Sequence, residues 1–434
     1  MKILIYTDTL SERLRYLIEV VFNEITPYTF EITNNFDSFL HSNDLKINYS
    51  LNNAPNCLQI IPFELLFSDE IKPYKLNFFE PENIVAFEEN LQEKNQYIYS
   101  HDFFAVVFFI ISRYEEYLDF MPDYHGRYTA KKSSLYAHGL HKKPYIDIQI
   151  NRFFSTLKII YPAFEPKPLE KIERTLTVDI DRIYKYKGKS SLHLFSKCVK
   201  NFVFFNKNEL KCIYNYVIKK QPDPYDAYNF IHNFTSQHKT KLHVFYLLSN
   251  KGKFDKNIID FNLLKQIYSL FKTESRQGIH PSYHSNFQKD LLKNEIKLFE
   301  KFFNIFPIES RQHYLKLTFP DTYNNLIANK IKQDFSMGWS DSIGFRAGTS
   351  HTFTWFNLSI NKTSILKITP FCAMDVTLKN YLKLNTKEAI IELREVLKTI
   401  EDNGGQFVSL WHNESLGTDY EWAGWREVME EIYN

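Results

Sequence analysis

The sequence predicts an α/β protein in which a smaller N-terminal α/β region precedes a parallel, helix-covered sheet or barrel. After residue 172, seven short apolar runs typical of strands alternate with stretches of helical periodicity. Such alternation predicts parallel strands with helices packed on the faces of the sheet. Polar residues also cluster at the C-terminal ends of these strands, which is the end that carries the chemistry in a (β/α) barrel.

Composition restricts the class of protein further. The chain has 434 residues, 44% of them hydrophobic, and a formal net charge of +2. This length suits two domains, and the small charge without a basic stripe predicts no binding to nucleic acid. Four scattered cysteines without a CxxC pair are typical of a reduced compartment. Nothing in the composition indicates an oligomeric state.

We expect a cytoplasmic protein without a membrane span. The N-terminus lacks the charged start, apolar centre and cleavage site of a signal peptide. The longest apolar run, Phe103–Ile111, has nine residues, which is too short to cross a bilayer and predicts a core helix.

Residues 1–165 are expected to form the N-terminal α/β domain, and their sequence indicates no role for it. Lys2–Tyr6 is typical of a strand, Ser11 is a candidate cap for the following helix, and Asp102 is a candidate cap for the apolar helix. Three prolines between residues 162 and 168 break regular structure, so the second domain is expected to span 172–434.

The second region supplies the candidate elements of the barrel. The predicted helices are Ile258–Phe271, Asn286–Phe303, Thr322–Lys332 and Thr386–Asp402. The seven candidate strands are Thr175–Asp181, Leu242–Ser249, Arg276–His280, Phe335–Trp339, Ile343–Thr349, Ile365–Met374 and Gln406–His412. The polar residues at their ends are Asp179, Asp181, His280, Arg346, Asp375 and His412.

Two histidines four residues apart form the first candidate metal motif. Pro281 disfavours helical backbone at His280, so His280 is expected to end an extended segment. The same proline suits the first position of a helical turn, which would bring His284 back to the face of His280. Two imidazoles on one face can hold a single metal ion, and Zn²⁺ in hydrolases typically takes such a pair together with a carboxylate.

Two aspartates at the end of a predicted buried strand supply that carboxylate. Asp179 and Asp181 point the same way because alternate strand residues share a face. Burying both is costly unless a cation or hydrogen bonds compensate. One aspartate can then ligate the metal while the other remains free as a base.

These motifs resemble those of the polysaccharide deacetylases, the NodB-like carbohydrate esterases of family 4. Residues 172–434 contain, in order, Thr-Val-Asp-Ile-Asp at 177–181, His-x-x-x-His at 280–284, Gly-Phe-Arg-Ala-Gly at 344–348 and a late strand that ends in Leu-Trp-His at 410–412. The chain is also similar to a branch of the family with an unassigned N-terminal domain. The resemblance implies a distorted (β/α)7 barrel and a divalent metal, most often Zn²⁺, that serves removal of an N-acetyl group from an amino sugar.

The resemblance also implies a role for each matching residue. Asp181, His280 and His284 are the implied metal ligands, and the ligand set also suits Co²⁺ or Ni²⁺. Asp179 is the implied general base and Arg346 its cationic partner, because a nearby cation keeps a carboxylate ionised. His412 is the implied general acid, and Asp375 is the candidate that orients it.

The motifs depart from the family pattern in ways that leave alternatives open. Ile180 separates the usually adjacent aspartates, Ala347-Gly348 replaces Pro-Pro after Arg346, and the tryptophan expected after Asp375 is missing. A non-catalytic glycan-binding or assembly protein, or a metal hydrolase of another amide or ester, therefore remains an alternative to deacetylation of a glycan or glycan precursor. Whether His313 lines the site is also left open.

Overall fold

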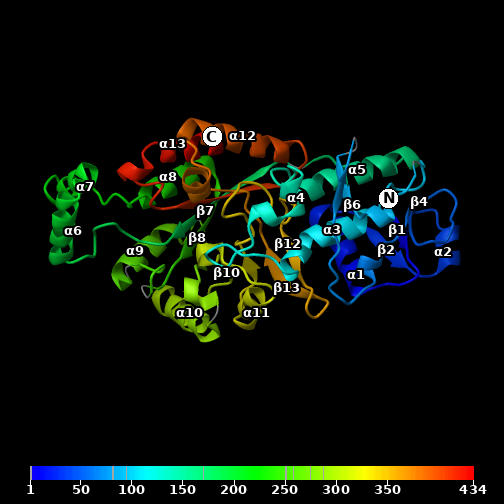
Figure 1. The fold of residues 1–434 in the computed structure, drawn as a ribbon, viewed down its shortest axis with the longest axis horizontal. Helices are drawn as coiled ribbons and strands as arrows, with labels where there is room; N and C mark the ends of the chain where they lie inside the picture. The colour runs from blue at the N-terminus through cyan, green and yellow to red at the C-terminus, as the bar shows by residue number, and fades with distance from the viewer. Residues whose placement is uncertain are drawn as a thin grey trace.

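The protein is described by a computed structural model that covers residues 2–80, 83–93, 95–169, 171–249, 252–257, 259–273, 275–286 and 288–434. Its chain builds two main sheets that consist almost entirely of parallel strands. The four-stranded sheet and its helices lie at one end of the molecule, and the nine-stranded sheet occupies the centre (Figure 1). Among the described helices, none is both long and apolar enough to cross a membrane.

The N-terminal sheet has the strand order β2-β1-β3-β4. Ser11 caps the first helix as predicted, because its side chain accepts a hydrogen bond from the backbone N–H of Leu14. Asp102 caps α3 in the same way through the N–H of Ala105 (2.9 Å), and every residue of α3 is buried. The elements are β1 (Ile3–Tyr6), α1 (Glu12–Glu19), β2 (Phe30–Thr33), α2 (Phe36–His41), β3 (Leu45–Tyr49), β4 (Leu58–Ile60), β5 (Asn77–Phe79), β6 (Ile84–Ala86), α3 (Phe103–Ile111), α4 (Ser134–Ala137) and α5 (Tyr145–Ile160).

The second sheet has the order β12-β13-β11-β10-β9-β8-β7-β15-β14, and its pairs are parallel except β12 with β13. No pairing between β12 and β14 is found within the described ranges, so the sheet is open and the expected seven-stranded closed barrel is not confirmed. The strands are β7 (Glu173–Ile180), β8 (Lys241–Tyr246), β9 (Arg276–Ile279), β10 (Glu309–Ser310), β11 (Gln333–Asp334), β12 (Phe353–Asn357), β13 (Lys362–Ile368), β14 (Ala373–Met374) and β15 (Gln406–His412).

Helices connect most of these strands, as the alternating pattern predicted. α12 begins with a capping box, in which Asn385 and Glu388 satisfy each other's backbone N–H groups. The helices predicted to begin at Ile258, Asn286, Thr322 and Thr386 correspond to α9, α10, α11 and α12, and Ile258 itself lies outside the described residues. The helices are α6 (Ser191–Val203), α7 (Lys207–Val217), α8 (Tyr228–His238), α9 (Phe261–Phe271), α10 (Lys289–Phe303), α11 (Asp321–Ala328), α12 (Thr386–Glu401) and α13 (Trp425–Tyr433).

Two expected strands are wrong. Residues 335–350 contain no strand, although Phe335–Trp339 and Ile343–Thr349 have the apolar character of one. Gly344 and Gly348 adopt φ values of +110° and +70°, which interrupt extended backbone. This segment is buried because it lies against the N-terminal region, and a buried loop carries the same apolar signal as a buried strand.

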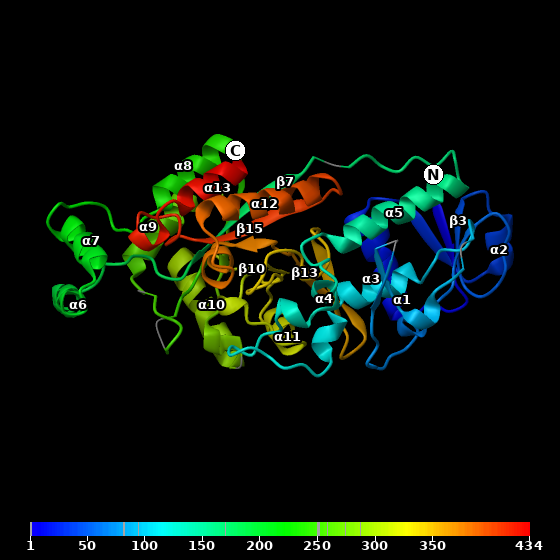
Figure 2. The ribbon, with the colours of Figure 1, turned by 45° about the horizontal axis from the view of Figure 1, so that its top comes forward.

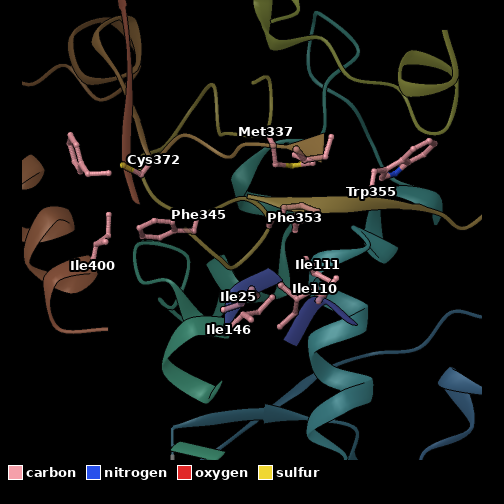
Figure 3. Close-up of a cluster of buried hydrophobic side chains, with 14 of the residues drawn as sticks. Ile25, Ile110, Ile111, Ile146, Met337, Phe345, Phe353, Trp355, Cys372 and Ile400 are labelled. Atoms are coloured by element: carbon pink, nitrogen blue, oxygen red, sulfur yellow. The ribbon is translucent and has the colours of Figure 1, made fainter. Parts of the chain in front are cut away.

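Glycine lets this segment approach the N-terminal region closely. A Cβ on Gly344 would lie 2.2 Å from the carbonyl oxygen of His141, and one on Gly348 would lie 2.6 Å from a side-chain carbon of Ile110. The N–H of Ile146 also donates to the carbonyl of Gly348 (2.8 Å). Figure 3 shows side chains of α3 and α5 facing those of the second region across one apolar core.

The core is therefore continuous between the two regions of the chain. Residues 161–169 form neither helix nor strand, and β7 begins at Glu173. The division into domains 1–165 and 172–434 stays a prediction, since the packing joins the two regions over a broad apolar contact.

Candidate metal centre

Three side chains that suit a metal ion meet at the C-terminal ends of neighbouring strands. One ligand atom from each of Asp181, His280 and His313 lies within 4.8 Å of the others. Asp181 and His280 directly follow β7 and β9, and His313 follows β10. Because β7, β8, β9 and β10 are consecutive parallel neighbours, these three residues emerge at the same edge of the sheet.

Both histidines turn the same nitrogen toward the aspartate. The Nδ1 of His280 lies 2.6 Å from the carbonyl oxygen of Arg311, and the Nδ1 of His313 lies 2.8 Å from Oδ1 of Asp255. In a neutral imidazole these acceptors require the proton on Nδ1, which leaves a lone pair on Nε2. The two Nε2 atoms lie 3.1 Å and 3.3 Å from the carboxylate oxygens of Asp181.

This arrangement fits a divalent cation. Metal-ligating histidines typically donate their second ring N–H to a carboxylate or a backbone carbonyl, as both do here. Oδ1 of Asp181 is buried and accepts no hydrogen bond from the described residues. A buried carboxylate oxygen without a donor is costly unless a cation compensates. Two imidazoles and one carboxylate are also a ligand set that Zn²⁺ takes in hydrolases.

The carboxylates at this site favour the binding of a cation. Burial acts to raise the pKa of Asp181, but the imidazoles of His313 and His280 lower it more, so it lies well below its ordinary value. Burial acts to lower the pKa of His313, but the carboxylates of Asp181 and Asp255 raise it to about 9. The same carboxylates would stabilise a bound metal ion.

His284 does not belong to this group, contrary to the spacing argument. Residues 280–282 form no helix, and a 3-10 helix begins at Tyr283. The expected helical turn from His280 to His284 is therefore absent. Instead, the carbonyl of Pro281 accepts from the N–H of His313 (3.1 Å), so parallel pairing brings His313 beside His280. Their ring centres lie 5.0 Å apart.

Asp179 lies beside the cluster of Asp181, His280 and His313. Its partner is Arg311 and not Arg346, which was the expected one. Nη1 of Arg311 donates to Oδ1 of Asp179 (3.0 Å) and to the hydroxyl of Thr177 (2.6 Å). Oδ2 of Asp179 lies 3.7 Å from Nε2 of His280. Both Asp179 and Arg311 are buried. Arg311 therefore fixes the position of the Asp179 carboxylate beside the cluster.

The pairing of Arg346 with Asp179 is corrected by the structure. Nε and Nη2 of Arg346 donate to the two carboxylate oxygens of Glu116 at 2.9 Å and 2.5 Å. Glu116 also pairs with Arg113 (2.8 Å). Arg346 lies in the segment 335–350, which turns toward the N-terminal region. The glycine-flanked motif at 344–348 therefore joins the two regions of the chain.

His412 and Asp375 form the expected pair. Nδ1 of His412 lies 2.8 Å from Oδ1 of Asp375, whose Oδ2 accepts from the backbone N–H of His412 (2.8 Å). The hydroxyl of Ser415 also donates to this carboxylate. Burial lowers the pKa of His412, but the carboxylates of Asp375 and Asp181 raise it to about 10. Nε2 of His412 lies 3.7 Å from Oδ2 of Asp181.

These groups open into a cavity of about 450 Å³. Arg127 brings the N-terminal region to its wall, where it donates to the carbonyl of Tyr314 (2.9 Å) and to the hydroxyl of Tyr381 (3.0 Å). The aromatic residues of the lining are Phe254, Tyr314, Tyr381 and Trp422. These rings give part of the cavity wall an apolar surface.

The site residues that the motifs did not assign carry little local signal. His313 comes shortly after β10, but neither it nor Arg311 lies in a strand, because β10 ends at Ser310 and His313 begins a 3-10 helix. The spacing of His280 and His284 was the stronger local pattern. No local signal marks Asp255 or Arg127, because loops far apart in the chain carry both to the site.

A family model matches the N-terminal region of the chain. A family of unknown function, DUF7033, matches residues 3–162. A search of curated proteins finds no match.

Three solved structures illustrate the similarity. A protein from Mycobacterium smegmatis described as a polysaccharide deacetylase is 12% identical, with 62% of this chain and 86% of that chain covered and a TM-score of 0.39. A polysaccharide deacetylase from Bacillus cereus is 12% identical, with 61% and 86% covered and a TM-score of 0.28. A pseudoenzyme of carbohydrate esterase family 4 from Bacillus anthracis is 10% identical, with 62% and 64% covered and a TM-score of 0.31.

Proposed function

We propose that this protein is a divalent-metal-dependent hydrolase that removes the acetyl group from an N-acetylated amino sugar of a glycan or glycan precursor. The observation that carries the proposal is the cluster of Asp181, His280 and His313, whose ligand atoms lie within 4.8 Å of one another. Zn²⁺ is the proposed metal. The sugar substrate is supported by the motif resemblance and by the aromatic residues that line the cavity.

Asp181, His280 and His313 would hold the metal. A divalent cation at this point would supply Lewis-acid polarisation of the acetyl carbonyl and a water of lowered pKa. Hydrolysis adds the water oxygen to the carbonyl carbon and breaks the C–N bond, which yields acetate and an amine.

Two other side chains would move the protons. Asp179 is held in place by Arg311 and would take a proton from the attacking water. The Nδ1 of His412 is held by Asp375, so its Nε2 faces the site and would give a proton to the departing amine. Asp375 acts as a positioning residue, because it fixes both the ring and the backbone of His412.

Metal content of the purified protein tests the proposal directly. We expect stoichiometric zinc in the wild type and its loss in His280→Ala and His313→Ala. His284→Ala is the matched control, since His284 is close in sequence but outside the cluster. Circular dichroism of each variant verifies that the fold is intact, and acetate release from N-acetylated sugars then tests turnover.

The outcomes separate the alternatives. Retention of metal in His313→Ala, together with its loss in His284→Ala, would restore the ligand set expected from sequence spacing. A wild type that binds no metal at neutral pH, even with added zinc, would refute the hydrolase mechanism. Metal binding without release of acetate from any sugar would favour a glycan-binding protein or a hydrolase of another bond.

A further inference from the structure

The α6–α7 hairpin stands apart from the rest of the molecule. Figures 1 and 2 show both helices at the end opposite the N-terminal sheet. α6 (Ser191–Val203) has no buried residue, although it is amphipathic in sequence. α7 (Lys207–Val217) packs on α6 and buries only Glu209 and Ile213.

The apolar face of α6 points into solvent. Leu192, Phe195, Val199 and Phe202 recur at spacings of three and four residues, so they share one face of the helix. Their side chains are 77%, 67%, 47% and 70% exposed. Further exposed hydrophobic residues lie at the end of α6 and in the turn (Val203, Phe204 and Phe205), on α7 (Tyr214) and directly after it (Ile218), and we call all of these residues the apolar patch.

Such a concentration differs from ordinary surface composition. Single exposed hydrophobic residues are normal, whereas a contiguous patch marks a surface that is covered in use. Four of the five phenylalanines that the structure leaves exposed in its described ranges belong to this patch, Phe261 being the other. Within the described ranges, no other part of the chain covers this patch.

The segment that carries the apolar patch is rich in lysine. Residues 187–220 contain eight lysines and one acidic residue, Glu209. Glu209 is buried and already pairs with Lys185 and Lys197. Lys200 and Lys211 are exposed on the hairpin. A second copy of the same hairpin would bring like charges together, whereas anionic lipid headgroups would neutralise them.

We propose that the α6–α7 hairpin binds the surface of an anionic lipid bilayer. A helix with phenylalanines on one face and lysines on its flanks lies in the interface, with its rings among the acyl chains and its ammonium groups at the phosphates. The helices are too short to span the bilayer, so the attachment is peripheral.

The hairpin is also connected to the rim of the cavity. Glu209 of α7 accepts from Lys185 (2.7 Å) and from the hydroxyl of Tyr186 (2.8 Å), and Lys185 also pairs with Asp419. Asp419 begins the loop whose residues Glu421 and Trp422 line the cavity. Bilayer binding would therefore hold the cavity near the membrane. Access to a membrane-borne glycan precursor follows from this placement and rests on the proposed function.

Co-sedimentation of the full-length protein with vesicles tests the apolar contribution. We expect binding to vesicles of phosphatidylcholine with phosphatidylglycerol, and much weaker binding to phosphatidylcholine alone. The double variant Phe202→Ser/Phe205→Ser should lower the partition coefficient about 100-fold, at roughly 10-fold for each buried ring. The control Leu51→Ser/Ile365→Ser removes hydrophobic residues that are 74% and 75% exposed elsewhere, and should bind like the wild type.

A second pair of variants tests the charge. Lys200→Glu/Lys211→Glu should weaken binding to the anionic vesicles about 10-fold or more, and added salt should weaken the wild type similarly. The control Lys362→Glu/Lys387→Glu makes the same charge change at exposed positions outside the hairpin and should have little effect. Metal content is measured in every variant and should not change, which separates this test from that of the proposed function.

Three results would overturn the proposal. The first is binding that the phenylalanine variant leaves unchanged. The second is a dimer in light scattering that the phenylalanine variant dissociates, combined with no vesicle binding, which would assign the patch to a second copy. The third is a monomer that binds neither kind of vesicle.

Discussion

Replacement of Glu116 by glutamine should destabilise the protein strongly. Glu116 accepts from Arg346 at 2.9 Å and 2.5 Å and from Arg113 at 2.8 Å. All three side chains are 2% exposed. Both guanidinium groups also lie over the ring of Trp339, at 5.4 Å and 5.5 Å from its centre. The variant would keep two buried cations while removing their shared anion.

The size of the loss in unfolding free energy follows from the burial of these three side chains. Removal of one partner from a buried ion pair costs about 3–5 kcal/mol, because the other charge stays desolvated. Two guanidinium groups lose their carboxylate here, so we expect about 4–5 kcal/mol. Burial acts to raise the pKa of Glu116, but Arg346 and Arg113 lower it below its ordinary value. The carboxylate therefore contributes stability at neutral pH, and this contribution is lost as the pH falls through the lowered pKa.

Urea unfolding of the wild type and variants measures this effect. Glu165→Gln is the matched control, because Glu165 pairs with Lys158 at the surface, where the side chains are 74% and 46% exposed. An exposed pair contributes about 0–1 kcal/mol. A loss below about 1 kcal/mol in Glu116→Gln, or a loss equal to that of the control, would refute the reasoning. Zinc content should be equal in both folded variants, since neither residue belongs to the metal cluster.

Three further predictions concern the site and its surroundings. Asp255→Asn should weaken zinc affinity about 10–100-fold in chelator competition, because Asp255 orients His313, and unchanged affinity would contradict this role. Asp375→Asn should lower kcat for acetate release about 10²–10⁴-fold with little change in KM, and a rise in KM alone would argue against positioning of His412. Burial lowers the pKa of His101 to about 4. Below pH ~6.5 the unfolded chain binds a proton at His101 that the folded chain does not, so the free energy of unfolding falls as the pH falls. This loss is about 2 kcal/mol between pH 7 and pH 5. His101→Asn should lack that part of the loss in urea unfolding, and an equal loss in both proteins would exclude His101 as its source.

Local sequence signals predicted the parts of the fold that depend on near neighbours. Ser11 and Asp102 were recognised as caps because a cap bonds backbone groups within its own first turn. Asp179 and Asp181 were recognised together because the period of a strand places them on one face. The motif resemblance made Asp375 the candidate that orients His412, and Nδ1 of His412 lies 2.8 Å from Oδ1 of Asp375 in the structure.

Similar local reasoning gave the wrong partners where distant segments meet. Helical spacing favoured His284, but pairing of the chain after β9 with the chain after β10 brings His313 to His280. Apolar content favoured strands at 335–350, but this segment is buried as a loop against the N-terminal region. Arg346 was assigned to Asp179 by motif order, whereas Glu116, 230 positions away, pairs with it.

The sequence by itself determined the α/β class, the helix caps and the aspartates at the end of β7, since each depends on the conformation of a few adjacent residues. The sequence also contains the amphipathic pattern of α6, but it does not show that the apolar face of this helix is exposed. Tertiary structure decided which imidazole joins Asp181 and which arginine joins Asp179. It also decided which apolar segments are covered. Strand register and the packing of the two regions set these outcomes, and both depend on contacts between residues far apart in the chain.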